Sequence, residues 1–249
     1  MGKTVLITGV SKGLGLALAQ KFKKEGFQVI GVSRSRPDIQ LDLFIQADFS
    51  SKEDVKKVFE TVDNKGIKID VLINNAGIGL YESWEEMDMA DLRRLFEVNF
   101  FSVVLLTKLF LPHLKEKKGS VINVSSVAGK LYVPFMGGYC ASKYALNAFS
   151  DSLRAELLND GVHVLNLIVG RINTGFSSRA MGSKKPPDTP FGASPEGFAD
   201  AVYSAYLKRK REITYPCWYR YFIWISRLFA PVYDRIALKK WTHSSSSSR

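Results

Sequence analysis

The residues best suited to chemistry in this sequence are Tyr139 and Lys143, which lie four positions apart. On a helix this spacing places both side chains on one face, one turn apart. A nearby ammonium favours the phenolate and lowers the pKa of a tyrosine, which is ordinarily near ~10. A tyrosine tuned in this way exchanges a proton with a carbonyl or an alcohol oxygen. Ser126 follows an apolar run that predicts a strand, so its hydroxyl can meet the phenol at one substrate oxygen.

The start of the chain decides between this chemistry and the alternative, a plain solvated helix face, which the Tyr-x-x-x-Lys spacing alone favours. A β-rich run from Lys3 to Thr8 leads directly into a glycine-rich turn, Gly9 to Gly15, and a helical stretch follows as far as Gly26. In this context glycines let the backbone approach a pyrophosphate, and the helix N-terminus offers free N–H groups. The sequence therefore predicts a dinucleotide site at this turn.

The second predicted strand, Phe27 to Val32, indicates which dinucleotide is bound. An acid just after this strand would bond the ribose 2′-hydroxyl of NAD, whereas an arginine suits the 2′-phosphate of NADP. The chain has Ser33 and then Arg34 here, and Lys12 in the glycine-rich turn adds a second cation. Two solvated charges are the alternative. The pattern favours NADP(H) over NAD(H).

The rest of the pattern alternates strands and helices. We expect further strands at residues 43–47, 70–74, 120–125 and 162–169. A capping box from Ser50 to Glu53 predicts a helix to about Asn64. Asp88 is predicted to cap one long helix, residues 89–117, and another helix is expected over residues 139–159. This rhythm predicts an α/β fold with a parallel sheet covered by helices on both faces.

Composition places limits on the whole chain. Its 249 residues fit one large α/β domain, and the two cysteines, Cys140 and Cys217, make a disulfide framework a poor explanation and suit a reducing compartment. We expect no signal peptide before the first strand and no membrane-spanning helix, because no uncharged apolar run reaches ~18 residues. We predict a cytoplasmic protein with no metal site.

Five motifs in fixed order carry a resemblance to a known family. They are Thr8-Gly9-x-x-x-Gly13-x-Gly15, Asn74-Asn75-Ala76-Gly77, Asn99, Ser126 and Tyr139-x-x-x-Lys143. Together they resemble the short-chain dehydrogenase/reductase family, in its compact single-domain branch, from about Lys3 to Pro216. The resemblance implies a Rossmann-type, doubly wound sheet of seven parallel strands, with Ile213 to Tyr215 as the seventh.

The resemblance also implies roles for the catalytic residues. Tyr139 would be the acid/base, and Lys143 would lower its pKa and bond the nicotinamide ribose. Ser126 would hold the substrate oxygen, and Asn99 would organise a water in the proton relay. The family usually has Pro-Gly after the sixth strand, where this chain has Val169-Gly170. The nicotinamide pose depends on this turn.

The implied cofactor residues extend along the same edge of the sheet. Asp48 would bond the adenine edge, Asn75 would line the cofactor cleft, and Thr174 would bond the carboxamide. The full predicted set for NADP(H) is Gly9, Ser11, Lys12, Gly13, Leu14, Gly15, Arg34, Asp48, Asn75, Ala76, Gly77, Tyr139, Lys143, Ile172 and Thr174.

A predicted boundary divides an NADP-binding catalytic domain, residues 1–216, from a basic, aromatic extension, residues 217–249. Residues 175–195 lie where the family has its substrate lid, and their apolar content indicates a hydrophobic carbonyl or alcohol substrate. A merely variable loop is the alternative.

The extension carries apolar residues at helical spacing from Trp218 to Ile236, and Pro231 is predicted to separate two helices. An aromatic stripe with arginines beside it is typical of a membrane interface. A helix packed over the substrate mouth or in a dimer is the alternative, and the two are compatible. The extension is similar to those of membrane-associated steroid and lipid reductases of the family. From Lys208 onward the chain has ten Lys or Arg and two acids, a charge that suits an anionic membrane.

The leading functional hypothesis is an NADP(H)-dependent oxidoreductase that interconverts a carbonyl and a secondary alcohol on a lipophilic, steroid-, retinoid- or lipid-like substrate. A 3-ketoacyl reductase acting on acyl-carrier or CoA thioesters is the runner-up. A non-enzymatic NADP-binding sensor or scaffold ranks lower, because both Tyr139 and Lys143 are present. Nucleic-acid binding ranks lowest, because the aromatics form a helical stripe and not a flat stacking platform. We expect a homodimer or homotetramer.

Overall fold

The computed structural model describes residues 2–187 and 192–246, and it contains one seven-stranded parallel sheet in the order β3-β2-β1-β4-β5-β6-β7. The strand order reverses direction between β1 and β4, which is where open α/β sheets bind ligands. This confirms the predicted Rossmann-type fold. The strands are β1 (Thr4–Thr8), β2 (Gln28–Ser33), β3 (Leu43–Gln46), β4 (Val71–Asn74), β5 (Ser120–Val124), β6 (His163–Val169) and β7 (Glu212–Tyr215).

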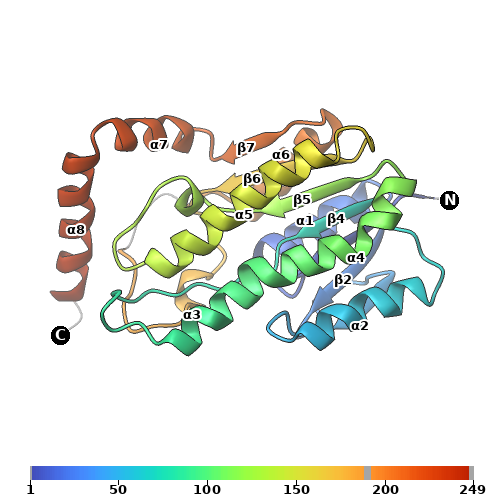
Figure 1. Ribbon diagram of the computed structural model, residues 1–249, viewed down its shortest axis with the longest axis horizontal. Coiled ribbons are helices and arrows are strands. Elements are labelled where there is room, and N and C mark those ends of the chain that lie inside the picture. Colours follow the sequence, from blue (N-terminus) through green and yellow to red (C-terminus); the bar gives the residue numbers. More distant parts are fainter. Residues whose placement is uncertain (1, 188–191, 247–249) are drawn as a thin grey trace.

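The sheet is buried on both faces, so its inner strands are continuously apolar rather than alternating (Figure 1). On one face α1 (Gly13–Lys24) and α6 (Pro195–Leu207) pack together around Phe22 and Phe198. On the other face lie α2 (Lys52–Asp63), α4 (Ser102–Glu116) and α5 (Gly137–Glu156). These two layers hold the carboxyl ends of the strands in fixed register.

The cap of α2 differs from the predicted capping box. Ser51, and not Ser50, is the N-cap, and its hydroxyl accepts a hydrogen bond of 3.1 Å from the N–H of Asp54. Ser50 instead bonds the carboxylate of Asp48 through its N–H and its hydroxyl. The box was placed one residue early because two serines stand side by side, and only the turn geometry distinguishes them.

The predicted long helix from Met89 is interrupted where Asn99 lies. Asp88 caps α3 (Met89–Phe96) as predicted, and a π-helical turn, Glu97–Phe101, joins it to α4. Single π-turns of this kind occur frequently at functional sites, because the extra residue re-aims the side chains. The continuous helix was therefore wrong at these five residues.

The combined helix Met89–Glu116 is long and apolar enough to cross a membrane by length and composition alone. Its apolar side chains are used inside the protein, since Leu106, Phe110 and Leu114 are fully buried against the sheet and α2. We regard it as a core helix of the fold.

Two helices follow β7, α7 (Tyr219–Leu228) and α8 (Ala230–Ser246), so the predicted helical extension is present. They separate at Phe229, and Pro231 lies in the first turn of α8, where its missing N–H costs nothing. Figure 1 shows α7 leaving the end of the sheet beyond β7, with α8 turning down beside the N-terminal end of α5. The predicted boundary at residue 216 falls between β7 and α7.

Candidate active site

One cavity of about 750 Å³ lies along the carboxyl ends of the strands and continues beneath α7 and α8. Its lining includes every predicted catalytic and cofactor residue except Asn99. The structure therefore brings together side chains from β1 to the loop after β6, across more than half of the chain. Which of them contact a cofactor or a substrate stays a prediction.

The glycine-rich turn at the head of α1 is shaped for close approach by a ligand. Gly9 and Gly13 have positive φ values of 75° and 61°, which glycine adopts without strain. A Cβ at Gly15 would lie 2.1 Å from the carbonyl oxygen of Gly9, so only glycine fits there. This leaves a bare backbone cradle at a helix N-terminus, which fits the pyrophosphate of a dinucleotide.

Thr8 and Asn75 fix that cradle to the next strand of the sheet. The Thr8 hydroxyl accepts hydrogen bonds of 2.9 Å from the N–H groups of both Asn75 and Ala76. The Asn75 amide in turn donates to the carbonyl oxygens of Thr8 and Gly9. The Asn75 side chain thus holds β1 and β4 together at the floor of the cavity.

The adenosine end predicted for NADP carries an exposed arginine and a bonded carboxylate. Arg34 and Lys12 line this end, and neither has an ion pair among the residues that the structure describes. Arg36 instead lies over the ring of Phe44. Burial tends to raise the pKa of Asp48, but hydrogen bonds from Ser50 and the charges of Arg34 and Arg94 outweigh it and lower that pKa.

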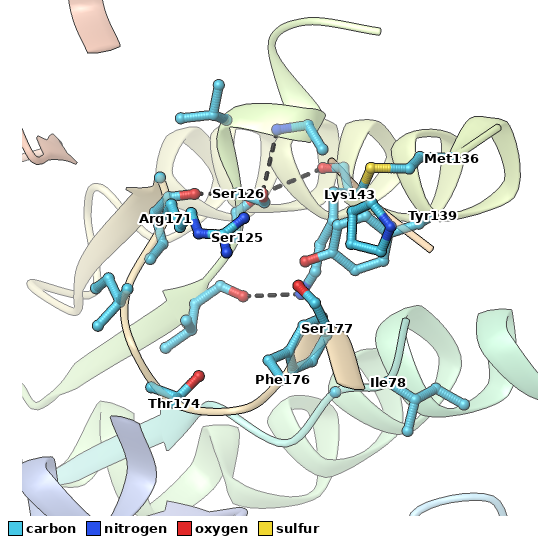
Figure 2. A pocket seen from close by; sticks show the side chains of 18 of the residues that line it. Ile78, Ser125, Ser126, Met136, Tyr139, Lys143, Arg171, Thr174, Phe176 and Ser177 are labelled. Atoms are coloured by element: carbon cyan, nitrogen blue, oxygen red, sulfur yellow. Dashed lines mark hydrogen bonds between the residues drawn. The ribbon is translucent and has the colours of Figure 1, made fainter. Parts of the chain in front are cut away.

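Tyr139 and Ser126 face the middle of the cavity (Figure 2). Tyr139 lies in the first turn of α5 and is 7% exposed, and Ser126 follows β5 and donates a hydrogen bond of 3.2 Å to the carbonyl oxygen of Val169. Burial raises the pKa of Tyr139 well above its usual value, and hydrogen bonding to Ser126 partly offsets that rise. The phenol is therefore protonated at neutral pH.

Lys143 lies one helical turn after Tyr139 and is buried. Its Nζ donates a hydrogen bond of 2.9 Å to the carbonyl oxygen of Val124 and lies 5.8 Å from the centroid of the Tyr139 ring. Burial lowers the pKa of Lys143 to about 8. The expected lowering of the tyrosine pKa by Lys143 is not found among the chain's own groups, because desolvation of the phenol dominates.

Asn99 lies behind the cavity and organises the loop after β4. Its side-chain oxygen accepts from the N–H of Ile78, and its amide donates to the carbonyl oxygen of Ile78 and to the Ser142 hydroxyl. At 1% exposure it has the satisfied partners that a buried amide needs. These three hydrogen bonds use both N–H groups of the amide. That Asn99 organises a water in a proton relay stays a prediction.

The far end of the cavity is apolar and comes from segments that sequence reasoning did not combine. Tyr81 follows β4, and Phe176 begins the predicted lid, of which residues 188–191 lie outside the described part. Much of the remaining wall comes from the extension, through Tyr219, Phe222, Ile225, Ser226, Phe229, Val232, Tyr233, Ile236, Ala237, Lys240 and Trp241. The helical stripe in the sequence identified most of these residues without indicating which surface they cover.

Gly170 explains how the extension reaches the site. A Cβ on Gly170 would lie 2.1 Å from the Tyr219 ring, so glycine allows α7 to pack directly on the turn after β6. Further along the extension, the Tyr233 hydroxyl donates a hydrogen bond of 2.8 Å to the carbonyl oxygen of Tyr132. The buried Trp241 ring contacts the rings of Tyr81 and Phe135. The extension therefore covers the mouth of the cavity in this chain.

Arg171 was missed, although it directly follows the Val169-Gly170 turn that the sequence singled out. It lines the cavity on the same side as Ser126 (Figure 2). The sequence could have identified Arg171 as a site residue, because it is a cation immediately after the turn that the resemblance places beside the nicotinamide.

A parallel sheet with a glycine cradle at the head of its first helix is typical of nucleotide-binding proteins. Comparison with family models matches residues 3–184 to the short chain dehydrogenase family. A curated relative, the uncharacterized oxidoreductase YbbO of Escherichia coli strain K12, is 35% identical over 233 residues, covering 87% of this chain and 86% of that protein. The NADPH-dependent 1-acyldihydroxyacetone phosphate reductase of Schizosaccharomyces pombe is 32% identical, covering 88% of this chain and 81% of that protein.

Solved structures agree with this assignment. A short-chain dehydrogenase from Streptomyces avermitilis superposes with a TM-score of 0.81 at 27% identity and covers 100% of both chains. The chain belongs to the short-chain dehydrogenase/reductase family, whose enzymes use nicotinamide cofactors. The resemblance drawn from the motifs is confirmed.

Proposed function

We propose that this protein is an NADP(H)-dependent oxidoreductase that interconverts a carbonyl and a secondary alcohol on a lipophilic substrate. The observation that carries the proposal is the single cavity. It joins the glycine cradle, the Tyr139 phenol and an apolar chamber closed by the extension.

The chain's own residues supply proton transfer and orientation. A neutral, buried Tyr139 donates its proton to the oxygen of a ketone, and Ser126 orients that oxygen beside it. Lys143, held by the Val124 carbonyl, is mostly charged at neutral pH and stabilises the phenolate that remains. When bound, NADPH would supply the hydride that the carbonyl carbon takes up.

Two observations support NADP(H) as the cofactor. Arg34 and Lys12 line the cavity where a 2′-phosphate would lie, and no acid occupies position 33. The S. pombe relative is named as NADPH-dependent. The glycine cradle fits the pyrophosphate of either cofactor, so the preference for NADP(H) over NAD(H) depends on Arg34 and Lys12.

The apolar chamber supports a lipophilic substrate. Its walls include Leu131, Val133, Met136 and Phe176 from the catalytic part, together with the aromatic and aliphatic face of α7 and α8. Such a lining favours long aliphatic chains or fused rings over small polar ketones.

The test is NADPH oxidation by the full-length protein with ketones of increasing chain length, steroids, retinoids, ketosphingoids and 3-ketoacyl thioesters. We expect kcat/KM to rise with apolar size. Preference for the thioesters would favour the ketoacyl reductase. Absence of turnover with every carbonyl, despite NADPH binding, would favour a cofactor-binding sensor and contradict the proposal.

We further propose that the outer face of the extension docks on an anionic membrane. Tyr221, Trp224 and Leu228 of α7 do not line the cavity and are 71%, 66% and 60% exposed, a large apolar area to leave in water. Arg220, Arg227 and Arg235 are exposed cations of the extension, and each cation near an anionic surface adds about 1 kcal/mol of attraction. The complementary charge selects lipid over a second copy of this equally basic chain.

Vesicle sedimentation tests the docking surface. We expect the full chain to sediment with phosphatidylglycerol vesicles at low salt, and not with phosphatidylcholine. Trp224→Ser with Leu228→Ser should abolish sedimentation while leaving NADPH affinity unchanged. A wild-type chain that stays in the supernatant, or that forms dimers lost in the double variant, would overturn the membrane proposal.

A further inference from the structure

The charges that line the cavity are unequally distributed. Its cofactor end has three cations, Lys12, Arg34 and Arg94, together with Asp48, the only acid in the described lining. The catalytic centre has Lys143. The substrate end has three more cations and no described acid, and these are Arg171, Arg179 and Lys240. An apolar chamber for neutral lipids has no need of this positive charge.

Arg171 follows the turn after β6 to which Ser126 is bonded. It lies two residues after Val169, whose carbonyl oxygen accepts the hydrogen bond of Ser126. Its backbone N–H donates to the Tyr219 hydroxyl at 3.4 Å, which fixes the main chain at the base of α7. Burial raises the pKa of Tyr81, and the Ser177 hydrogen bond and the charge of Arg171 partly offset that rise.

The guanidinium of Arg171 has donors to spare. One of its nitrogens donates to the Pro187 carbonyl oxygen at 3.4 Å, a weak bond, and no carboxylate among residues 2–187 and 192–246 forms an ion pair with it. A guanidinium has five N–H donors in a planar fork that matches a phosphate or carboxylate. A half-buried cation of this kind is suited to an anionic ligand group.

We propose that Arg171 binds an acidic group on the substrate, and that the substrate is therefore an anionic lipid ketone. Its acidic group, a phosphate or carboxylate, lies close to the carbonyl, because Arg171 and Ser126 share one side of the cavity (Figure 2). Its apolar chain extends along Phe222, Phe229 and Ile236 of the extension. This inference rests on the proposed function and narrows its substrate class.

The direct test is ligand binding to the NADPH-loaded, full-length protein, which requires no turnover. The probes are dodecyl phosphate, dodecanoate, dodecanol and inorganic phosphate. We expect the two anionic lipids to bind about 10- to 100-fold more tightly than dodecanol, because a hydrogen bond to a charged group contributes this much affinity. The tighter of the two anionic probes identifies the acidic group, and inorganic phosphate alone should bind weakly.

Four variants separate this site from general attraction to a basic protein. Arg171→Met should reduce the affinity for the anionic probes to that for dodecanol, and Arg171→Lys should restore part of it. Arg220→Met removes the same charge from an exposed position outside the cavity and should change nothing. Asp188→Asn neutralises the acid that follows Pro187 in sequence. The anionic probes should still bind more tightly than dodecanol in this variant. NADPH affinity, unchanged in all four variants, confirms that they fold.

Turnover then distinguishes the two proposals. With 1-palmitoyl dihydroxyacetone phosphate and its dephosphorylated form, we expect Arg171→Met to lower kcat/KM only for the phosphate. Equal binding of dodecanol and both anionic probes by the wild type overturns the anion site, even if neutral ketones are reduced. Tight anion binding without turnover of any ketone overturns the proposed reaction and leaves the anion site standing.

Discussion

The two ends of the cavity are built in different ways. The cofactor end comes from neighbouring strand ends, and hydrogen bonds between side chains and backbone of Thr8, Gly9 and Asn75 fix it. The substrate end is assembled from the loop after β4, the turn after β6 and the extension. Half-exposed residues such as Phe229 and Val232, at 55% and 54%, form its outer wall.

This difference indicates which properties vary independently. A cradle with glycine backbone in close contact and several hydrogen bonds tolerates almost no change, whereas helices resting on a few aromatic contacts belong to the low-stability part of a fold. The extension can therefore change its sequence, and with it the substrate, without disturbing nucleotide binding. Variants at each end should consequently affect separate parameters.

The largest separation is expected from Gly15→Ala. The added Cβ would lie 2.1 Å from the Gly9 carbonyl oxygen, so the turn must move. A displacement of about 1 Å at a positioned group costs on the order of 10²-fold, and we expect NADPH affinity to fall by at least this factor. Fluorescence titration measures it, with circular dichroism to confirm the fold. Unchanged NADPH affinity would show that the turn does not hold the cofactor.

Arg34→Ala should separate the two nicotinamide cofactors. Loss of a charged hydrogen bond to the 2′-phosphate should weaken NADPH binding by about 10- to 100-fold and leave NADH binding unchanged. Arg36→Ala is the matched control, because Arg36 lies over the Phe44 ring and not in the cavity lining. Equal losses for both cofactors would remove the 2′-phosphate contact from the account.

Gly170→Ala should act only at the substrate end. Its Cβ would overlap the Tyr219 ring and push α7 outward, raising KM for a long-chain ketone about tenfold, within the range of couplings between contacting residues. NADPH affinity should change far less, because the glycine cradle at the other end of the cavity is untouched. Tyr219→Gly in the same chain makes room for the methyl group, so the double variant should lose less than the two single effects combined. If the effects of the two substitutions on KM simply add, Gly170 does not act through its contact with Tyr219.

The smallest effect concerns pH. Burial lowers the pKa of Lys143 to about 8, so the ammonium is present below this pH and is lost above it. If its charge is needed, kcat/KM for NADPH, which reports the free enzyme, should fall about tenfold per pH unit above ~8. Lys143→Met should give low activity without this decline. A wild-type profile that stays flat to pH 10 contradicts a role for the ammonium.

The same contrast explains what the sequence predicted. The strand positions, the glycine cradle and the Tyr139–Lys143 pair depend on local requirements, such as a positive φ at Gly9 or a one-turn spacing, and these are visible in the residues. The π-turn at Asn99 was not predicted even in this part, because nothing in an apolar helical run indicates one inserted residue.

The substrate end was not predictable in the same way. The stripe of α7 and α8 showed an apolar face without its partner, and only the fold places Tyr219 on Gly170 and Trp241 beside Tyr81. Arg171 looked like any turn cation until its neighbours were known. The raised pKa of Tyr139 likewise depends on burial by residues from several segments, and not on the lysine spacing.

Replacement of Tyr139 by phenylalanine tests the central claim most directly. Consumption of NADPH and formation of the secondary alcohol are measured together on the best ketone of the panel. We predict that both proceed in equal amounts in the wild type and fall by about 10²–10⁴-fold in Tyr139→Phe, while NADPH affinity stays within twofold. A variant that keeps more than about a tenth of the wild-type kcat would contradict Tyr139 as the proton donor.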